Sequence, residues 1–367
     1  MNKYKIIPAA LVLVAGAAHA QSSVTLYGLI DEGLTYTSNV GGKSLLALTG
    51  GELQQGSRWG LKGQEDLGSG LSAVFLLENG FNLSNGQATQ SGQEFGRQAY
   101  VGLSSSDAGK VTFGRQYDSV VDYIAPETTA GSWGGTLFAH PYDNDNTSDS
   151  FRVNNSVKYT SVNYSGLQFG GLYGFSNQAG GFADNRAWSI GAKYANGPLS
   201  IGAAYMNLDN PRGTTAGAVV DSPYIAARQN VGGVAANYMI GTVTLGLAYT
   251  HTDISDRPST FSNTLKFDNI EFNTKVDLTS AIYVGAMYDY TKVAIDFGPG
   301  QSQQNNGHSN QFGLMTGYRL SKRTELYLQA AYQKGTGNGV VVALGDGSEQ
   351  STSDNQTMVR AGIRTSF

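Results

Sequence analysis

The chain has no cysteine, few prolines and, beyond its first residues, no long apolar segment. Without cysteine, a chain of 367 residues cannot depend on disulfides, so its stability has to come from the fold itself. Its 8 prolines contrast with 49 glycines and 21 tyrosines, a composition that favours strands and tight turns over helices. After residue 16, no segment approaches the roughly 20 apolar residues that a membrane helix requires. A membrane location would therefore require a closed β-barrel, because only helices and barrels satisfy every backbone group in lipid.

The sequence also lacks an excess of basic charge and any recognisable catalytic or metal-binding motif. Its 24 basic and 28 acidic residues give a net charge of −4, which argues against a nucleic-acid-binding protein. The histidines at 19, 140, 251 and 308 have no paired spacing, so neither a zinc site nor a Ser/His/Asp triad is indicated. The acidic run Asp143–Asp149 lacks the glycine and glutamate of a calcium loop. We expect no enzyme activity, no cofactor and no metal.

The N-terminus has the features of a secretory signal peptide. Two lysines occur among the first five residues, an apolar stretch follows from Ile6 to Gly16, and Ala18-His19-Ala20 provides small residues for cleavage. The alternative, a membrane anchor, needs a longer apolar run. We therefore predict a signal peptide at residues 1–20, cleaved after Ala20, and one mature domain at 21–367.

The rest of the chain alternates between two kinds of side chain with a period of two, which is typical of strands that separate an apolar from a polar environment. In the last segment, apolar side chains up to Phe367 alternate with polar or small ones such as Arg360 and Arg364. The same pattern recurs in sixteen segments. They are residues 24–36, 56–66, 71–82, 95–104, 110–116, 155–164, 167–176, 186–195, 199–208, 229–239, 243–252, 268–277, 281–291, 311–320, 324–334 and 356–367.

The connections between these segments alternate between short and long. Gly241-Thr242 is an example of a short turn, whereas Asp209–Arg228 is long and polar. Short turns at one end and long loops at the other are typical of outer-membrane barrels, and a soluble sandwich would not show this asymmetry. We predict an all-β fold, a 16-stranded antiparallel transmembrane β-barrel whose polar or small inner face encloses a hydrated lumen.

One connection, residues 117–154, is much longer than the others. Long loops in compact folds are usually functional or disordered, and the aromatic residues Tyr123, Trp133 and Phe138 argue against disorder. We expect this third outer loop to fold inward against the barrel wall. A loop that projects outward is the alternative.

Several arginines are predicted to point into the lumen. Arg58 and Lys62 have the parity opposite to Trp59 and Leu61, and Arg97 has the parity opposite to Tyr100. Arg152 lies where the long connection rejoins the wall at the sixth segment. Because a charge in lipid is costly, the inward orientation is favoured for each of them. The alternative role for these arginines is simple pairing with carboxylates of the wall.

Four stretches resemble the trimeric general-diffusion porins of Gram-negative outer membranes, in particular their beta-proteobacterial branch. They are Val24-Thr-Leu-Tyr-Gly-Leu-Ile-Asp31, Ser57-Arg-Trp-Gly-Leu-Lys-Gly-Gln-Glu-Asp-Leu-Gly68, Gly109-Lys-Val-Thr-Phe-Gly-Arg-Gln-Tyr117 and the terminal Phe367. The resemblance extends over the mature chain. It implies passive diffusion of ions and small hydrophilic solutes through a pore in the cell outer membrane. A substrate-specific channel is the alternative function.

The resemblance also implies the residues of a pore constriction, at which wall arginines face acidic residues of the third outer loop. The arginine positions are Arg58, Arg97 and Arg152. Pro126-Glu127-Thr128-Thr129 matches the family's loop tip only in part, and Asp118, Asp122 and Glu127 are the acids that we predict to line the gap. The arginines favour anions, but the acidic loops leave the ion selectivity open.

The remaining implications of the resemblance concern assembly. It implies a homotrimer in contact with outer-membrane lipid and lipopolysaccharide, with Phe367 as a signal read by the barrel assembly machinery. Arg115 shares the parity of the apolar Val111 and Phe113, so we expect it to contact a neighbouring subunit.

Overall fold

The computed structural model describes residues 23–50, 53–90, 92–213, 217–257, 263–297, 304–345, 347 and 349–367. The predicted signal peptide, residues 1–20, lies outside these ranges. Within them, seventeen strands form a single antiparallel sheet. They are β1 (Ser23–Val40), β2 (Lys43–Thr49), β3 (Arg58–Gly68), β4 (Leu71–Gly80), β5 (Gln98–Ser105), β6 (Gly109–Gln116), β7 (Val153–Thr160), β8 (Leu167–Gly174), β9 (Ala187–Asn196), β10 (Leu199–Asp209), β11 (Arg228–Ile240), β12 (Val243–Ser255), β13 (Thr264–Asp277), β14 (Ile282–Asp296), β15 (Gln304–Arg319), β16 (Thr324–Gly337) and β17 (Asn355–Ser366).

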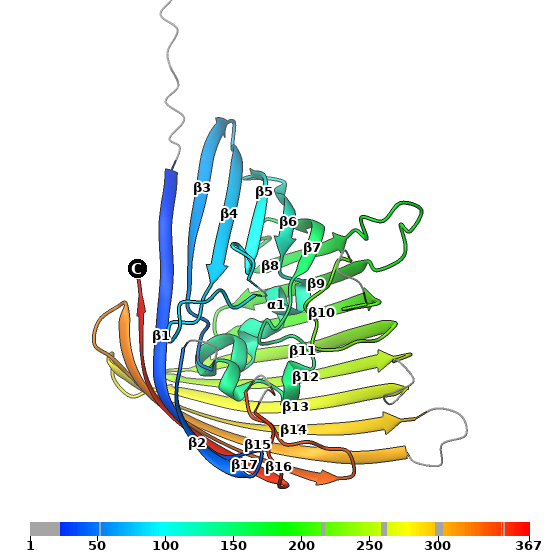
Figure 1. Ribbon diagram of the computed structural model, residues 1–367. Coiled ribbons are helices and arrows are strands. Elements are labelled where there is room, and N and C mark those ends of the chain that lie inside the picture. The colour runs from blue at the N-terminus through cyan, green and yellow to red at the C-terminus, as the bar shows by residue number, and fades with distance from the viewer. Residues whose placement is uncertain are drawn as a thin grey trace, which may run out of the picture.

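The first strand closes the sheet into a barrel. The start of β1, Ser23–Leu29, pairs with β3, and residues Leu29–Thr37 pair along the other edge of β1 with β17. From β3 to β17, each strand pairs with the next one in the chain. Sixteen strands, β1 and β3 to β17, therefore form the closed antiparallel wall, which confirms the predicted fold class (Figure 1).

The remaining strand, β2, was not predicted. It pairs with Gly33–Val40 of β1, on the same edge as β3 but farther along, so β2 and β3 share one place in the wall. The break between them allows residues 53–57 to leave the sheet and contact the segment that follows β6.

The side chains of the wall alternate as a period of two requires. In β12, Leu245, Leu247 and Tyr249 are exposed, whereas the intervening Gly246 and Ala248 are buried. Two residues connect β11 to β12, while long connections such as the one between β10 and β11 lie at the opposite end. No helix in the described part of the chain is long and apolar enough to cross a membrane.

Two predicted orientations near β5 and β6 are wrong. The register of β6 against β7 shifts between Gly114 and Gln116, a β-bulge that turns the Arg115 side chain away from the outer face. The guanidinium of Arg115 instead bonds Gly96 O at 2.7 Å, Asn154 Oδ1 at 2.6 Å and Asp221 Oδ2 at 2.5 Å. Val101 and Leu103 are the exposed residues of β5. Tyr100 has the opposite parity and therefore points inward.

Candidate functional site

The segment between β6 and β7 contains one short α-helix, three 3-10 turns and one π-helical turn. They are α1 (Ser119–Tyr123), η1 (Ala125–Glu127), η2 (Ala130–Gly134), η3 (Thr136–Phe138) and η4 (Pro141–Asp143). Asp118 caps α1, since its Oδ1 accepts from the backbone N–H of Val120 at 2.7 Å and of Val121 at 3.3 Å. Burial raises the pKa of Asp118 to about 6.

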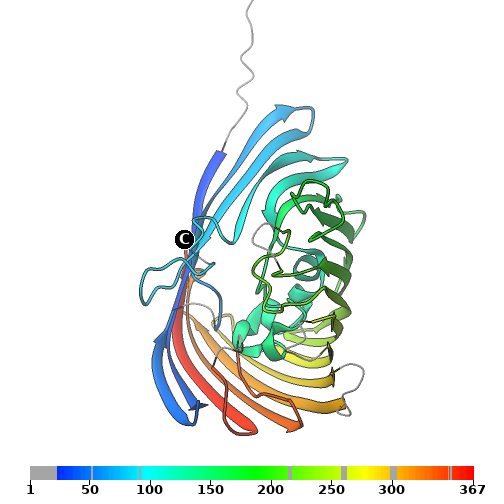
Figure 2. The same ribbon diagram turned by 45° about the vertical axis from the view of Figure 1, so that its right-hand side comes forward.

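Apolar side chains hold this segment against the wall. Val120, Tyr123, Ile124 and Phe151 share one buried cluster with strand residues such as Met206. In the second cluster, Leu137 and Phe138 pack with Tyr283, Met287, Met315 and Tyr327, and Trp133 packs against its edge. Gly202 of β10 allows a close backbone approach, because a Cβ there would lie 1.7 Å from the carbonyl oxygen of Tyr123. Figure 2 shows α1 and the following turns beside the green and yellow strands.

The break between β2 and β3 provides a second support. The backbone N–H of Leu137 donates to the carbonyl oxygen of Leu53 at 2.6 Å. Gly135 has a φ of +70°, and a Cβ at this position would lie 1.6 Å from the carbonyl oxygen of Gln54. Glycine is therefore required here by both conformation and space.

A buried polar cluster anchors the end of the segment. His140 Nδ1 lies 2.7 Å from Asp145 Oδ2, and its Nε2 lies 3.4 Å from Glu271 Oε2 and 3.7 Å from Asp289 Oδ1. Burial alone would lower the pKa of His140, but the charges of Asp145 and Asp289 outweigh burial and raise that pKa well above 6.5. A protonated imidazole can thus compensate carboxylates that belong to the segment and to two wall strands.

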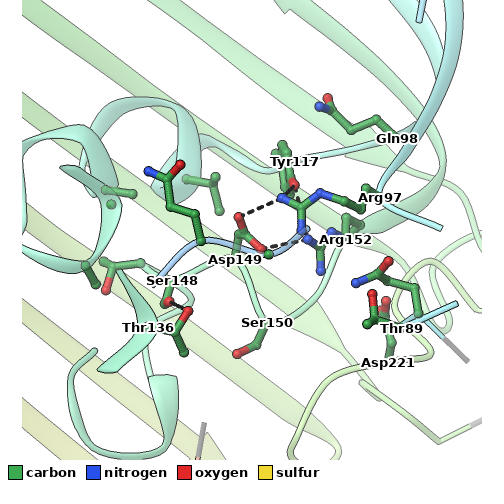
Figure 3. A pocket seen from close by; sticks show the side chains of 18 of the residues that line it. Thr89, Arg97, Gln98, Tyr117, Thr136, Ser148, Asp149, Ser150, Arg152 and Asp221 are labelled. Carbon is green, nitrogen blue, oxygen red and sulfur yellow. Dashed lines mark hydrogen bonds and ion pairs between the residues drawn. The ribbon is translucent and has the colours of Figure 1, made fainter. Parts of the chain in front are cut away.

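Arg97 and Arg152 both bond to two residues of the segment (Figure 3). These are Tyr117, at its start, and Asp149, near its end. Arg97 Nη2 donates to Tyr117 Oη at 2.7 Å and to Asp149 Oδ2 at 3.2 Å. Arg152 Nη2 donates to the same hydroxyl at 3.1 Å and to Asp149 Oδ1 at 2.6 Å. Arg97 Nε also donates to Glu78 Oε1 at 2.9 Å. The two guanidinium groups are therefore fixed in place by charge-assisted bonds.

A cavity of about 650 Å³ lies beside this arginine cluster. One side is formed by wall residues that include Arg58, Glu78 and Gln98, and the other by Val121, Pro126, Ala130 and Ser148 of the segment after β6. Arg58 lies 3.9 Å from Glu78 and is the least buried of the three predicted arginines. The charged residues of the lining are Arg58, Arg97, Arg152 and Arg212 against Glu78, Asp149 and Asp221. The cavity is polar and its charged groups have both signs.

Comparison with known proteins shows the family. The sequence profile of the Gram-negative porins matches residues 9–338. An outer membrane porin protein of Bordetella pertussis is 35% identical, with 91% of this chain and 94% of that protein covered. The chain belongs to the Gram-negative porin family.

Other relatives agree with this assignment. Outer membrane porin protein 32 of Delftia acidovorans is 29% identical over the full length of both chains. Among solved structures, the anion-selective porin from Comamonas acidovorans shares the fold with a TM-score of 0.74 at 24% identity, and the alignment covers 95% of this chain and 100% of that one. The family confirms the predicted outer-membrane location and a passive channel in place of an enzyme.

The porin brings the predicted arginines together but not the predicted acids. Arg58, Arg97 and Arg152 all line the cavity, whereas Asp118, Asp122 and Glu127 are absent from its lining. Asp118 is used as the helix cap. Asp122 forms an ion pair with Lys158. Glu127 lies 2.9 Å from Lys193 Nζ and accepts hydrogen bonds from Ser200 and Asn237. These three partners belong to β9, β10 and β11, away from the arginines.

Three residues of the porin's arginine cluster were missed as site residues. Glu78 could have been identified as a carboxylate on a membrane strand, which calls for an inward position and a partner. Asp149 lies three residues before Arg152 and is its salt-bridge partner. Tyr117 directly follows β6, and nothing in its sequence context indicates that two arginines bond its hydroxyl.

Proposed function

We propose that the cavity beside Arg97 and Arg152 is the waist of a water-filled channel for ions and small hydrophilic solutes. In this proposal, the segment from 117 to 154 folds into the lumen and narrows it, and solutes pass between the segment and the arginine side of the wall. The proposal is carried by one observation: Tyr117 and Asp149 of the segment bond directly to Arg97 and Arg152. These two arginines immediately precede the wall strands β5 and β7.

The charges at this waist support selection by a transverse field. Arg97 and Arg152 are buried and held by Glu78 and Asp149, so their positions are fixed, and Arg58 is the more accessible third arginine. Fixed charges that line a narrow pore select ions because water screens them poorly there. Four arginines against three carboxylates line the cavity, and we propose a preference for anions.

The experiment that tests the proposal is the reversal potential across a planar bilayer under a salt gradient. Replacing Arg97 by serine removes one positive charge and leaves Glu78 less compensated, so the reversal potential of Arg97→Ser should shift towards cation preference. Arg228→Ser is the matched control, because Arg228 is exposed and lies 3.8 Å from Asp209 at the long-loop end of β11, away from the cavity. Equal reversal potentials for the two variants would contradict the proposed waist.

We also propose the assembly and export of the chain as its sequence predicts. The mature protein would be residues 21–367 after cleavage behind Ala20. It would form a homotrimer, surrounded by lipid and lipopolysaccharide and inserted by the barrel assembly machinery. The apolar side chains of the strands are exposed on the outer face of the barrel, which supports contact with lipid or a neighbouring subunit.

A further inference from the structure

A second cavity, of about 240 Å³, lies on the other side of α1. Val121 of α1 lines the first cavity, whereas Asp122 and Tyr123 line the second. The second cavity lies towards the short connections, since Lys110 is near the start of β6 and Thr160 ends β7. Its other lining residues are Gln98, Tyr100, Thr112, Gln116, Lys158 and Gln168.

Two lysines in this cavity face a single carboxylate. Lys158 forms an ion pair with Asp122 and donates from Nζ to the carbonyl oxygen of Tyr117 at 2.9 Å. Lys110 pairs with Thr160, two residues beyond Lys158, so the two lysines are diagonal neighbours on the inner face. The ammonium of Lys110 lies 5.9 Å from the centre of the Tyr100 ring, and in the described part of the chain it forms no ion pair with a carboxylate. The cavity therefore has one positive charge in excess.

The uncharged groups of the lining are suited to an anion. Hydroxyl groups of Tyr100, Tyr123 and Thr160 and the amide of Gln98 can donate hydrogen bonds, and lysine is a common point-charge ligand of phosphate. The volume is below the range of about 300–1,000 Å³ that is typical of drug-sized ligands, so the occupant has to be small.

We propose that this cavity is a binding site for a small oxyanion of the phosphate class, with Lys110 and Lys158 as its charged ligands. The proposal rests on the proposed channel function, because the anion would reach the site through the waist. An anion that has passed the arginine cluster would meet a second positive site on the far side of α1, before the exit at the short turns.

Single-channel recording with inorganic phosphate tests the site. Phosphate added at constant ionic strength and near-neutral pH should lower the chloride current of the wild-type channel in a saturable way, as the bound anion obstructs flow. In Lys110→Gln, the loss of one charge-assisted bond should raise the half-saturating phosphate concentration about tenfold or more. Lys110→Arg retains the charge and should stay within about threefold of the wild type.

Lys275→Gln is the matched control. Lys275 is an inward-facing lysine at the short-turn end of β13, where it lies 3.1 Å from Asp277, and it does not line the second cavity. Its replacement should leave the half-saturating concentration within about twofold of the wild type. A wild-type channel that conducts normally without saturable phosphate block, or equal shifts in Lys110→Gln and Lys275→Gln, would overturn the site while the channel function stands. Absence of any wild-type conductance would overturn the channel function itself.

Discussion

Gly28 of β1 and Phe367, the last residue of the sequence, exchange both of their backbone hydrogen bonds. Gly28 N donates to Phe367 O at 3.2 Å, and Phe367 N donates to Gly28 O at 3.1 Å. The Phe367 ring covers the space in which a side chain at position 28 would lie, because a Cβ there would be 2.3 Å from Phe367 Cζ. This pair extends the ladder of β1 and β17 by one step and contributes to barrel closure.

Gly28→Val should therefore impair closure of the barrel. The new side chain would displace the Phe367 ring and also press against the carbonyl oxygen of Arg58, 2.8 Å from the Cβ position. Overpacking of this kind costs about 1–3 kcal/mol. We expect a lower yield of folded, heat-modifiable protein on gels run without boiling, and a similar loss when Phe367 is deleted.

Gly181→Val serves as the control for this prediction. Gly181 lies in the long connection between β8 and β9, and the nearest atom to its Cβ position is the end of the Asp184 side chain at 3.3 Å. Its yield should match the wild type. Normal yield of Gly28→Val, or normal yield with altered conductance on deletion of Phe367, would contradict the role in closure.

Asp149→Asn should shift the reversal potential towards anions. Asp149 accepts from both Arg97 and Arg152, so its neutralisation removes the one carboxylate that bonds to both arginines, while an amide oxygen can still accept. The side chain is partly exposed to the cavity, and the fold should be retained. Measurement under a salt gradient, with the wild type as reference, gives the direction of the shift.

Glu127→Gln provides the comparison for Asp149→Asn. Glu127 was predicted from the sequence to line the constriction, but it is buried against Lys193, Ser200 and Asn237. Its neutralisation should change the reversal potential much less than that of Asp149. A larger shift in Glu127→Gln would place the selective site on the opposite wall.

The strands and the faces of this barrel could be predicted because a period of two is a local property of the sequence. Each of the sixteen predicted segments overlaps one strand of the wall, although strands such as β14 and β15 extend beyond the predicted bounds. The prediction fails where the period is interrupted. Arg115 is turned by the bulge after Gly114. Tyr100 was given the outer face by its parity relative to Arg97, but Arg97 lies just before β5, where the alternation has not yet begun.

The partners that residues 117–154 provide for the arginines could not be predicted, because they depend on contacts between distant segments. Residues 117–152 contain many acidic residues, and their sequence does not show which one meets an arginine. Asp118 is diverted to a helix cap, and the position of Asp149 follows from packing of Leu137, Phe138 and Phe151 against the wall. The alternation in the sequence identifies which charged side chains face inward. Which acidic residue pairs with the arginines is decided only when the segment folds.

Arg115→Ala should leave the proposed homotrimer intact. The guanidinium of Arg115 is bonded within the subunit, where it holds Asp221 of the connection between β10 and β11. Its loss should loosen that connection and increase current noise. Electrophoresis in sodium dodecyl sulphate and chemical cross-linking should still show trimer.

Phe113→Arg is the complementary variant for the trimer. Phe113 is 51% exposed on the outer face of β6, and Leu247, on the outer face of β12, is 52% exposed. An outward arginine costs about 2–4 kcal/mol in lipid at either position, which makes Leu247→Arg a matched control. The subunit contact predicted from the sequence lies on the face of Val111 and Phe113, so we expect trimer loss in Phe113→Arg alone. Dissociation of Arg115→Ala, or equal behaviour of the two outward arginine variants, would place the subunit contact elsewhere.

The buried cluster around His140 should make the anchoring of residues 117–154 dependent on pH. The groups that face His140 are Asp145 of the segment, Glu271 of β13 and Asp289 of β14. Because the pKa of His140 is raised when folded, its contribution is fully present below its ordinary value of 6.5 and is lost as the pH rises through the raised value. Alkaline pH should therefore weaken the anchor.

Trp133 can report this change, because it packs beside Leu137 and Phe138 in the segment. The sequence has three tryptophans, so replacing Trp59 and Trp188 by phenylalanine leaves Trp133 as the only one. Its emission should stay constant from neutral pH upwards until the His140 proton is lost, and should then shift to the red. Burial raises the pKa of Asp143 to about 7, so a variant that lacks His140 is needed to assign a step in the alkaline range.

His140→Gln should abolish the alkaline step and leave Trp133 red-shifted at neutral pH. Removing one partner from a buried charge cluster costs about 3–5 kcal/mol, since Asp145, Glu271 and Asp289 would lose their shared positive charge. His251→Gln is the control, because His251 forms a comparable pair with Asp268 at 2.8 Å but is only partly buried on β12. An alkaline step that persists in His140→Gln, or a step lost in His251→Gln, would show that another group controls the anchor.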